Sequence, residues 1–456
     1  MSISDAFHIY DTTLRDGAQQ EGLNLSVHDK LTIARHLDDL GVGFIEGGWP
    51  GANPKDTEFF RLAQSELRLK NATFVAFGAT RRAGIKAADD AQLRALVDSG
   101  ASVITLVAKS HDRHVDLALK TTLDENLAMI RDSIQFLRSE GRRVFLDAEH
   151  FFDGYRSNSS YALEVVRTSA EAGADVVALC DTNGGMLPDE LSDVVHEVLG
   201  KSSARLGIHC HNDTGCAIAN SLAAVAAGVT HVQGTLNGYG ERTGNADLVS
   251  IIANLQLKKD QQVLPKGKLE EAFRISHAVA EVTNVAPSAR QPYVGISAFA
   301  HKAGLHASAI KVDPTLYQHE DPELVGNDMR MLVSDMAGRA SIELKSQELG
   351  IDLGKDKEVV TRVVERVKSM EARGYTFEAA DASFELLLRE EVAGKRPNFF
   401  SLESWETTVD QNVDGSVSSR ASVVIKARGE VIQATGSGNG PVNAIDTALQ
   451  IGRAHV

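Results

Sequence analysis

The stretch Ala172-Gly173-Ala174-Asp175-Val176-Val177-Ala178-Leu179-Cys180-Asp181 contains the pattern that decides the fold. A helical pattern ends at Gly173, and a short apolar run that closes on a carboxylate follows it. Glycine at such a position ends a helix and leads into a buried strand. The same step recurs as Gly41-Val42, Gly100-Ala101 and Gly228-Val229. The first part of the chain is therefore predicted to alternate strands and helices, as βαβ units do.

Eight strands are predicted in this part of the chain, about 30 residues apart as βαβ units require. They cover residues 7–14, 44–48, 73–77, 102–108, 143–148, 176–181, 206–210 and 231–235. Eight strands with intervening helices favour a closed barrel over an open doubly wound sheet, and no Gly-x-Gly-x-x-Gly follows the first strand. The predicted fold class is α/β, a (β/α)8 TIM barrel, whose chemistry takes place at the carboxyl ends of the strands.

After about residue 250 the alternation gives way to helical patterns over residues 268–284 and 355–372, with a mixed segment between them. Residues 384–388, the β-rich run 419–426 and a glycine-rich hairpin or turn at 436–441 indicate the start of a further, α+β domain. We expect a barrel over residues 1–275, a mostly helical region over 276–381 and an incomplete α+β domain over 382–456.

The last six residues, Ile451-Gly452-Arg453-Ala454-His455-Val456, match one reading frame of a widely used sequencing adapter. Our hypothesis is that the natural chain is longer and that this end is an artefact; the alternative is an ordinary frayed C-terminus. Resequencing the source gene distinguishes the two, because an authentic stop codon after Val456 would contradict the hypothesis.

Composition limits the partners and the compartment. Lys and Arg number 47 against 62 Asp and Glu, and the net charge of -15 argues against nucleic acid or an anionic membrane as the main partner. Three cysteines suit a reducing compartment. No apolar run is long enough to cross a bilayer, and residues 1–5 lack the features of a signal peptide. The expected location is the cytoplasm.

His209 and His211 form the most informative pair in the chain. Because side chains alternate along a strand, both imidazoles point to one side and Cys210 points to the other. The pair therefore predicts a two-histidine metal site rather than a thiolate cluster. The alternative for such a pair is a hydrogen-bonded structural role.

The first strand delivers Arg15, Asp16 and Gln19 to the catalytic face. A carboxylate there can bind a metal, and an arginine can hold a small carboxylate or stabilise charge on a reacting carbonyl. The alternative is a surface Arg-Asp pair. In a closed barrel only one strand separates the seventh from the first, so Asp16, His209 and His211 can share one ion.

Three other strand ends carry polar groups. The turn after strand eight presents Asn245 as a further oxygen ligand, and its glycines are not followed by the Lys-Ser or Lys-Thr of a phosphate loop. Strand five contributes Glu149, which beside a cation is a candidate for proton transfer, and strand six contributes Thr182, which can donate to a carboxylate.

Three motifs together resemble one enzyme family. Asp-Thr-Thr-Leu-Arg-Asp-Gly-x-Gln at residues 11–19, His-x-His-Asn-Asp at 209–213 and Gly-x-Gly-Glu-Arg-x-Gly-Asn-Ala at 238–246 look like those of the metal-dependent acyl-CoA condensing enzymes, which include isopropylmalate, homocitrate and citramalate synthases. The resemblance covers essentially the whole chain. It implies a divalent ion (zinc, manganese or magnesium) bound by Asp16, His209, His211 and Asn245. It also implies substrate contacts from Arg15, Gln19 and Thr182, and catalysis by Arg15 and Glu149.

The resemblance extends to the segment after the barrel. Ala300-His301-Lys302-Ala303-Gly304-Leu305-His306 is similar to the family segment whose final histidine assists deprotonation of the acetyl group, which implies a catalytic role for His306. Tyr317 matches a tyrosine that is also credited with catalysis. The segment reads Gly304-Leu305-His306-Ala307-Ser308 where Gly-Ile-His-Gln-Asp is commoner, so a structural role for both residues is the alternative.

The segment Ile45-Glu46-Gly47-Gly48-Trp49-Pro50 resembles the citramalate synthase branch and departs from the Glu-Val-Gly-Phe-Pro of isopropylmalate synthases. That branch joins acetyl-CoA, pyruvate and water into (R)-citramalate and CoA, a first step of a pyruvate route to isoleucine. The alternative is a 2-isopropylmalate synthase acting on 2-oxoisovalerate in leucine biosynthesis. The two pockets differ by a few methyl groups, worth about 1 to 3 kcal/mol.

The resemblance also implies the remaining partners. Family members are homodimers, and an end-product amino acid regulates them through the C-terminal domain, which is expected to be cut short here. Two further classes stay open: a lyase or aldolase on the same barrel, and a noncatalytic metal-binding or regulatory protein.

Overall fold

The computed structural model describes residues 6–353, 357–395 and 398–454, so residues 1–5 and the last two residues of the adapter-like end lie outside the description. The chain divides into two compact units. The first comprises Met1–Ala300 and Thr315–Arg330, and the second comprises His301–Pro314 and Met331–Val456.

The first unit is a closed barrel of eight parallel strands in sequence order, in which β8 returns to pair with β1. Its strands are β1 His8–Asp11, β2 Phe44–Gly48, β3 Thr73–Ala79, β4 Val103–Lys109, β5 Arg143–Glu149, β6 Val176–Asp181, β7 Leu206–Cys210 and β8 His231–Gly234. Each predicted strand is present, so the barrel prediction is confirmed.

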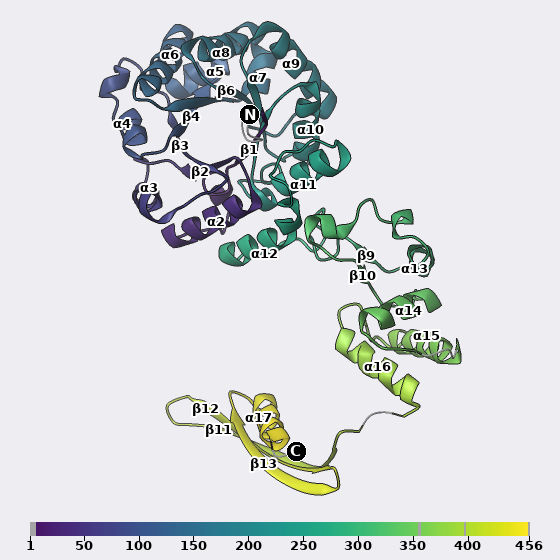
Figure 1. Cartoon of the computed structure of the whole chain (residues 1–456). Helices are drawn as coiled ribbons and strands as arrows, with labels where there is room; N and C mark the ends of the chain where they lie inside the picture. The colour runs from purple at the N-terminus through teal and green to yellow at the C-terminus, as the bar shows by residue number, and fades with distance from the viewer. Residues whose placement is uncertain (1–5, 354–356, 396–397, 455–456) are drawn as a thin grey trace. The chain divides into compact units, whose positions relative to one another are not determined.

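Helices surround the strands, as Figure 1 shows in purple to teal. They are α2 Val27–Leu40, α3 Pro54–Glu66, α4 Ala91–Asp98, α5 Asp112–His114, α6 Leu123–Ser139, α7 Phe151–Ser157, α8 Ser159–Ala172, α9 Pro188–Lys201, α10 Ala217–Ala227, α11 Leu248–Ala253 and α12 Ala272–Thr283. Short 3-10 helices are η1 Gly17–Gln19, η2 Ala87–Asp89, η4 Leu236–Gly238, η6 Leu269–Glu271, η7 Pro314–Leu316 and η8 Pro322–Val325, and short π-helices are η3 Val115–Leu119 and η5 Asn254–Lys258. Gly41 and Gly173 end α2 and α8 in the left-handed conformation, as the sequence pattern predicts.

Two apolar layers hold the barrel together. A large cluster lies between strands and helices, and a smaller one fills the interior with Tyr10, Phe44, Val75, Val103, Phe145 and Val176. Alternate residues of each strand supply the two layers: Ile9 belongs to the outer cluster and Tyr10 to the inner one. The interior is therefore filled by side chains at this level, and the space for a ligand lies nearer the carboxyl ends of the strands.

The first strand is shorter than residues 7–14, because it ends at Asp11. The Asp11 carboxylate accepts hydrogen bonds from the backbone N–H and the hydroxyl of Thr13, at 2.8 and 3.0 Å, and the chain turns there. This turn directs the following residues, Arg15 and Asp16, across the open end of the barrel.

The second unit contains a helical part and a sheet. β9 Ala300–His301 and β10 Arg330–Met331 pair at its boundary, and α13 Gly304–Ile310, α14 Arg339–Glu348, α15 Lys357–Glu371 and α16 Asp381–Ala393 follow. The helix predicted over 355–372 is α15; residues 355 and 356 lie outside the described part. Residues 384–388 belong to α16, where Phe384, Leu387 and Leu388 are buried in one core with residues of α15.

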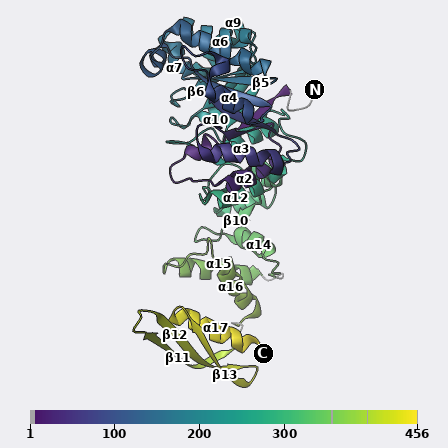
Figure 2. The same cartoon turned by 90° about the vertical axis from the view of Figure 1, so that its left-hand side faces the viewer.

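Beyond residue 400 the chain forms an antiparallel sheet of β11 Ser401–Gln411, β12 Val417–Ala427 and β13 Glu430–Gly438, followed by α17 Pro441–Ala454. Figures 1 and 2 both show α17 packed on one face of this sheet. The glycine-rich run 436–441 is the end of β13 and the turn into α17, not a hairpin. Its glycines allow close packing: a Cβ on Gly436 would lie 2.4 Å from the backbone nitrogen of Ala448.

No helix among the described residues is long and apolar enough to cross a membrane. All three cysteines are free, and Cys180 and Cys210 are buried.

We predict that Asp38→Ala lowers the free energy of unfolding by about 2 to 4 kcal/mol, because buried acceptors of several N–H groups are expensive to remove. The Asp38 carboxylate accepts the backbone N–H groups of residues 70–72 at 2.8 to 3.1 Å and so ties the start of β3 to α2. Urea unfolding followed by far-UV circular dichroism measures the loss. The exposed neighbour variant Asp39→Ala should stay within about 0.5 kcal/mol of the wild type, and equal losses would contradict the prediction.

Candidate active site and metal centre

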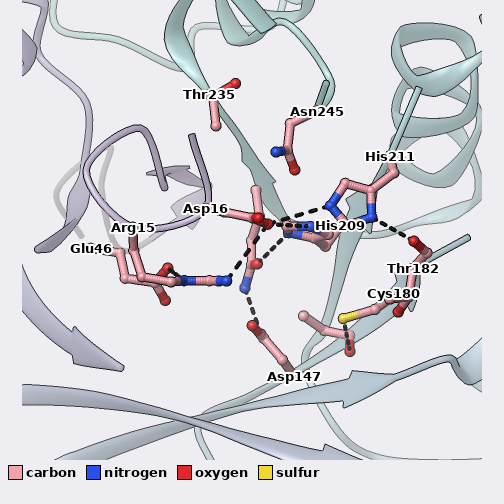
Figure 3. A network of polar contacts seen from close by, with 12 residues as sticks. Arg15, Asp16, Glu46, Asp147, Cys180, Thr182, His209, His211, Thr235 and Asn245 are labelled. Atoms are coloured by element: carbon pink, nitrogen blue, oxygen red, sulfur yellow. Dashed lines mark hydrogen bonds and ion pairs between the residues drawn. The ribbon is translucent and has the colours of Figure 1, made fainter. Parts of the chain in front are cut away.

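Asp16, His209 and His211 meet at the carboxyl ends of β1 and β7 (Figure 3). The Asp16 Oδ2 lies 3.2 Å from His209 Nε2 and 3.5 Å from His211 Nε2. All three side chains are buried, and one ligand atom of each lies within 4.8 Å of the others. One carboxylate and two imidazoles this close match the donor set of a divalent metal site.

Hydrogen bonds orient both imidazoles with Nε2 toward Asp16. His209 Nδ1 lies 2.9 Å from the Gln233 Oε1, and His211 Nδ1 lies 2.6 Å from the Thr182 carbonyl. Both partners are acceptors, so each Nδ1 carries the proton and each Nε2 has a lone pair to offer. Metal-binding histidines are held by outer hydrogen bonds of this kind.

Asn245 lies beside this cluster and pairs with His211 in an isolated β-bridge. Its side chain is directed toward the histidines and Asp16 (Figure 3), and its Nδ2 donates to the Tyr239 carbonyl at 3.0 Å. This bond turns Oδ1 the other way, and that buried oxygen has no hydrogen-bond partner in the described structure; the same is true of His211 Nε2. Buried polar atoms normally have partners. A divalent cation would satisfy both atoms, so these residues fit a metal.

The charges of the cluster also favour binding of a metal ion. Burial would raise the pKa of Asp16, but the charge of Arg15 and the two neighbouring imidazoles hold that pKa well below its usual range. Burial would lower the pKa of His209, but the hydrogen bond and charge of Asp16 outweigh it and raise that pKa. The Asp16 carboxylate therefore attracts a positive charge, which a metal ion can supply in place of the His209 proton.

Arg15 is held beside the cluster by its own network. Its Nε donates to Glu46 Oε2 at 2.6 Å, and its guanidinium carbon lies 3.9 Å from the ring centre of Phe77. Glu46 is buried in the middle of β2 and also accepts from the Tyr10 hydroxyl at 2.6 Å. One guanidinium edge thus faces Glu46, and another nitrogen lies 3.6 Å from Asp16 Oδ2.

These groups line one cavity of about 230 Å³. Of the residues that the sequence predicts for the site, the cavity brings together Arg15, Asp16, Gln19, Glu149, Thr182, His209 and His211. Its apolar wall consists of Trp49, Phe77 and Val107. Trp49 packs edge-on against Phe77 with ring centres 5.4 Å apart, and its indole N–H donates to Gln92 Oε1 at 3.0 Å.

Glu149 presents a carboxylate at the cavity edge, and Thr182 presents a hydroxyl group. Glu149, at the end of β5, pairs with Lys109 at the end of β4. The next residue, His150, has a φ of 58° in the left-handed region, and its backbone N–H donates to the Thr182 hydroxyl oxygen at 2.8 Å. Because that oxygen already accepts a hydrogen bond, the hydroxyl proton of Thr182 is left to donate elsewhere.

Three predicted residues are not part of this lining: Asn245, which lines a neighbouring pocket, His306 and Tyr317. His306 is on α13 of the second unit, with its ring centre 6.2 Å from that of His301. Tyr317 follows η7 in the first unit and is partly exposed. Their catalytic roles stay predictions.

Sequence reasoning missed several residues that support the site, namely Tyr10, Glu46, Lys109, Asp147 and Gln233. Their common signal is a polar residue at an inward-facing position of a buried strand, as with Gln233 two residues after His231. Burial and the charge of Glu46 raise the pKa of Asp147 to about 6. A carboxyl or amide at such a position rarely lacks a partner. Marking every second residue of each strand as inward-facing would therefore have identified these residues.

Three family models match successive parts of the chain. Residues 6–279 match the HMGL-like family, residues 293–375 the homocitrate synthase post-HMGL domain-like family, and residues 378–453 the LeuA allosteric (dimerisation) domain. The (R)-citramalate synthase of Streptomyces coelicolor is 68% identical over 98% of this chain and 84% of its own length.

The chain belongs to the (R)-citramalate synthase family. It is accordingly an enzyme, an acyltransferase. The 2-isopropylmalate synthase of Methanocaldococcus jannaschii is more distant, at 32% identity over 99% of this chain and 84% of its own length. The structure of an HMG-CoA lyase from Bacillus subtilis, 20% identical with a TM-score of 0.52, covers 62% of this chain and 94% of that one and shares the barrel fold.

We predict that Asp16→Asn and His209→Ala lose divalent-metal affinity by more than about 100-fold, since removing even an outer partner of a ligand typically weakens binding 10- to 100-fold. Calorimetric titration of the metal-stripped protein with Mn²⁺ or Zn²⁺ measures this, with circular dichroism to verify the fold. The exposed variant His196→Ala on α9 serves as the control. Wild-type affinity in either site variant would exclude the triad as the metal site.

Proposed function

We propose that this enzyme condenses acetyl-CoA with pyruvate and water to give (R)-citramalate and CoA. The observation that carries the proposal is the convergence of Asp16, His209 and His211 with Arg15 in one small cavity. A 2-keto acid needs a cation for its two adjacent oxygens and a positive group for the oxygen that gains charge, and this cavity offers both.

The metal would be held by Asp16, His209, His211 and Asn245. When bound, a divalent ion supplies Lewis acidity that polarises a keto carbonyl, and zinc, manganese and magnesium can all do so. The protein's own groups orient the substrate. Arg15, fixed by Glu46, faces the oxygen that gains charge, the Thr182 hydroxyl donates to the substrate carboxylate, and Gln19 lies at the rim.

Condensation also requires removal of a methyl proton from the thioester. We propose His306, or Glu149 through a water molecule, as the base, with Tyr317 assisting. Lys109 keeps the Glu149 carboxylate beside the cavity through its ion pair. The thioester methyl carbon then bonds to the keto carbon, the electrons of the C=O π bond move onto the keto oxygen, and that oxygen takes up a proton to become the hydroxyl. Hydrolysis of the thioester then releases CoA and makes the overall reaction effectively irreversible.

The apolar wall supports pyruvate as the keto acid. Trp49 presents a large ring to the cavity, and the hydrogen bond to Gln92 together with the Phe77 contact holds that ring in place. A methyl group needs little room beside this wall, whereas the branched chain of 2-oxoisovalerate needs more. The alternative, 2-isopropylmalate synthase activity, is therefore disfavoured by this side chain.

We also propose the wider setting of the enzyme. The match of residues 378–453 to an allosteric dimerisation domain supports a homodimer whose activity an end-product amino acid inhibits. Citramalate formation would start a pyruvate route to isoleucine. Three free cysteines suit the cytoplasm. We propose the division at residues 1–275, 276–381 and 382–456 into a catalytic barrel, a helical region that completes the active site, and a regulatory domain.

The direct test measures CoA release from acetyl-CoA with pyruvate, 2-oxoisovalerate or 2-oxoglutarate, using metal-loaded enzyme and a thiol reagent. We expect kcat/KM for pyruvate to exceed that for the other two by at least about tenfold, the discrimination that small apolar differences allow. Preference for 2-oxoisovalerate would establish the alternative. Absence of CoA release with all three, together with cleavage of a hydroxyacyl-CoA, would point to a lyase.

We predict that Trp49→Ala lowers the preference for pyruvate over 2-oxoisovalerate by about 10- to 100-fold in kcat/KM, because it opens space for the branched chain worth about 1 to 3 kcal/mol. The other tryptophan provides a matched control: Trp405, on β11 of the second unit, is exposed. Trp405→Ala should leave the ratio unchanged. An unchanged ratio in folded Trp49→Ala would remove Trp49 from the selectivity argument.

A further inference from the structure

We propose that Gln233 and Asp147 are positioning residues that hold His209 in the tautomer and orientation needed to bind the metal ion. The proposal rests on the proposed metal site and adds two residues to it. The proposal is based on a series of hydrogen bonds between side chains across the barrel interior. His209 Nδ1 lies 2.9 Å from Gln233 Oε1, and Gln233 Nε2 donates to Asp147 Oδ1 at 2.7 Å.

This series of hydrogen bonds joins three strands and lies in the barrel interior. His209 is on β7, Gln233 on β8 and Asp147 on β5, so the contact to Asp147 crosses the barrel. His209 and Gln233 are direct neighbours in the strand register. Gln233 is completely buried, and the other two are exposed by only 4%. Gln233, which has no exposed surface, therefore depends on its protein partners for its hydrogen bonds.

The surroundings decide which way the Gln233 amide faces. Its nitrogen has two acceptors, the Asp147 carboxylate and, at 3.3 Å, the Nε2 of His231. A reversed amide would place its oxygen against the carboxylate. Burial holds the pKa of His231 well below its usual value, so this ring is neutral, and its Nε2 accepts when the ring proton is on Nδ1. The oxygen of the amide must then face His209, which requires the His209 proton on Nδ1 and leaves Nε2 for the ion.

A glycine leaves room for the His231 ring beside Gln233. On β7, Gly207 lies opposite His231, and a Cβ there would come within 2.7 Å of the His231 ring and 3.1 Å of the Ala178 Cα. The other metal histidine is fixed differently, because His211 donates to the backbone carbonyl of Thr182. Side-chain substitution can therefore loosen His209 while leaving the hydrogen bond of His211 intact.

The test compares Mn²⁺ affinity by calorimetry in four metal-stripped proteins: wild type, Gln233→Leu, Asp147→Asn and Thr105→Val. Gln233→Leu leaves the His209 proton without an acceptor and should weaken binding about 10- to 100-fold. Asp147→Asn keeps an acceptor for Gln233 and should stay within about threefold of wild type. Thr105 is equally buried, and its hydroxyl bonds to that of Tyr10 and not to Gln233 or Asp147, so Thr105→Val controls for disturbance of the interior.

A second measurement separates positioning from a purely structural role. If Gln233 acts through the ion, saturating Mn²⁺ should restore most of the kcat of Gln233→Leu, while its midpoint of metal activation stays shifted. Thermal unfolding without metal reports any loss of packing. Gln233→Leu binding Mn²⁺ within threefold of wild type would overturn the proposal. Absence of Mn²⁺ binding by the wild type would overturn the metal site itself.

The double variant Gln233→Glu with Asp147→Asn keeps the series of hydrogen bonds but reverses the one between positions 233 and 147. The amide introduced at position 147 donates to the carboxylate introduced at position 233, which still accepts from His209. We expect the Mn²⁺ affinity of this variant to stay within about fivefold of wild type, as outer partners that keep their hydrogen bonds preserve the ligand. The variant also tests the proposal if Gln233→Leu does not fold. A loss of 10-fold or more in the folded double variant would overturn it.

Discussion

The structure depends on one buried carboxylate. Asp16 is only 4% exposed at the open end of the barrel, where an unpaired charge would be strongly disfavoured. Arg15 and two histidines surround it, and Arg15 in turn is paired with Glu46, a carboxylate with no exposed surface. Each charge in this cluster is tolerated because another lies next to it. The groups come from β1, β2 and β7, so only a closed barrel can bring them together.

This arrangement explains why the barrel interior changes character along its length. Tyr10, Phe44 and Phe145 form an apolar layer, while Gln233 and Asp147 lie inward beside His209, and Glu46 lies inward beside Arg15. The Tyr10 hydroxyl bridges the two regions, because its ring packs in the layer and its oxygen reaches Glu46. The polar groups are fully occupied with one another, which gives the ligands a rigid support.

The barrel and the histidine pair could be predicted from the sequence because both rest on local periodicity, whereas the other candidate site residues were found by their positions at strand ends and in the motifs of a known family. Strand runs, helix-ending glycines and the His209–His211 spacing need no tertiary information. The supporting residues needed it: Glu46 and Gln233 look like isolated polar residues until the closed barrel places Arg15 and His209 beside them. The end of β1 was missed for a local reason, since the Asp11 turn overrides an otherwise strand-like run.

The cavity has a charged side, with Arg15 and Asp16, and an apolar side that limits the size of a ligand. Phe77 connects the two sides, because Arg15 lies over its ring and Trp49 packs against its edge. A change at Phe77 would therefore disturb the charged cluster together with the shape of the cavity. Trp49 has an independent hold through Gln92, and its loop is tied down separately, since Asp56 accepts the backbone N–H of Trp49 at 2.9 Å and pairs with Lys30. The shape of the cavity at Trp49 can thus change without moving Arg15, so the proposed selectivity for the keto acid is separable from the charged cluster around Asp16.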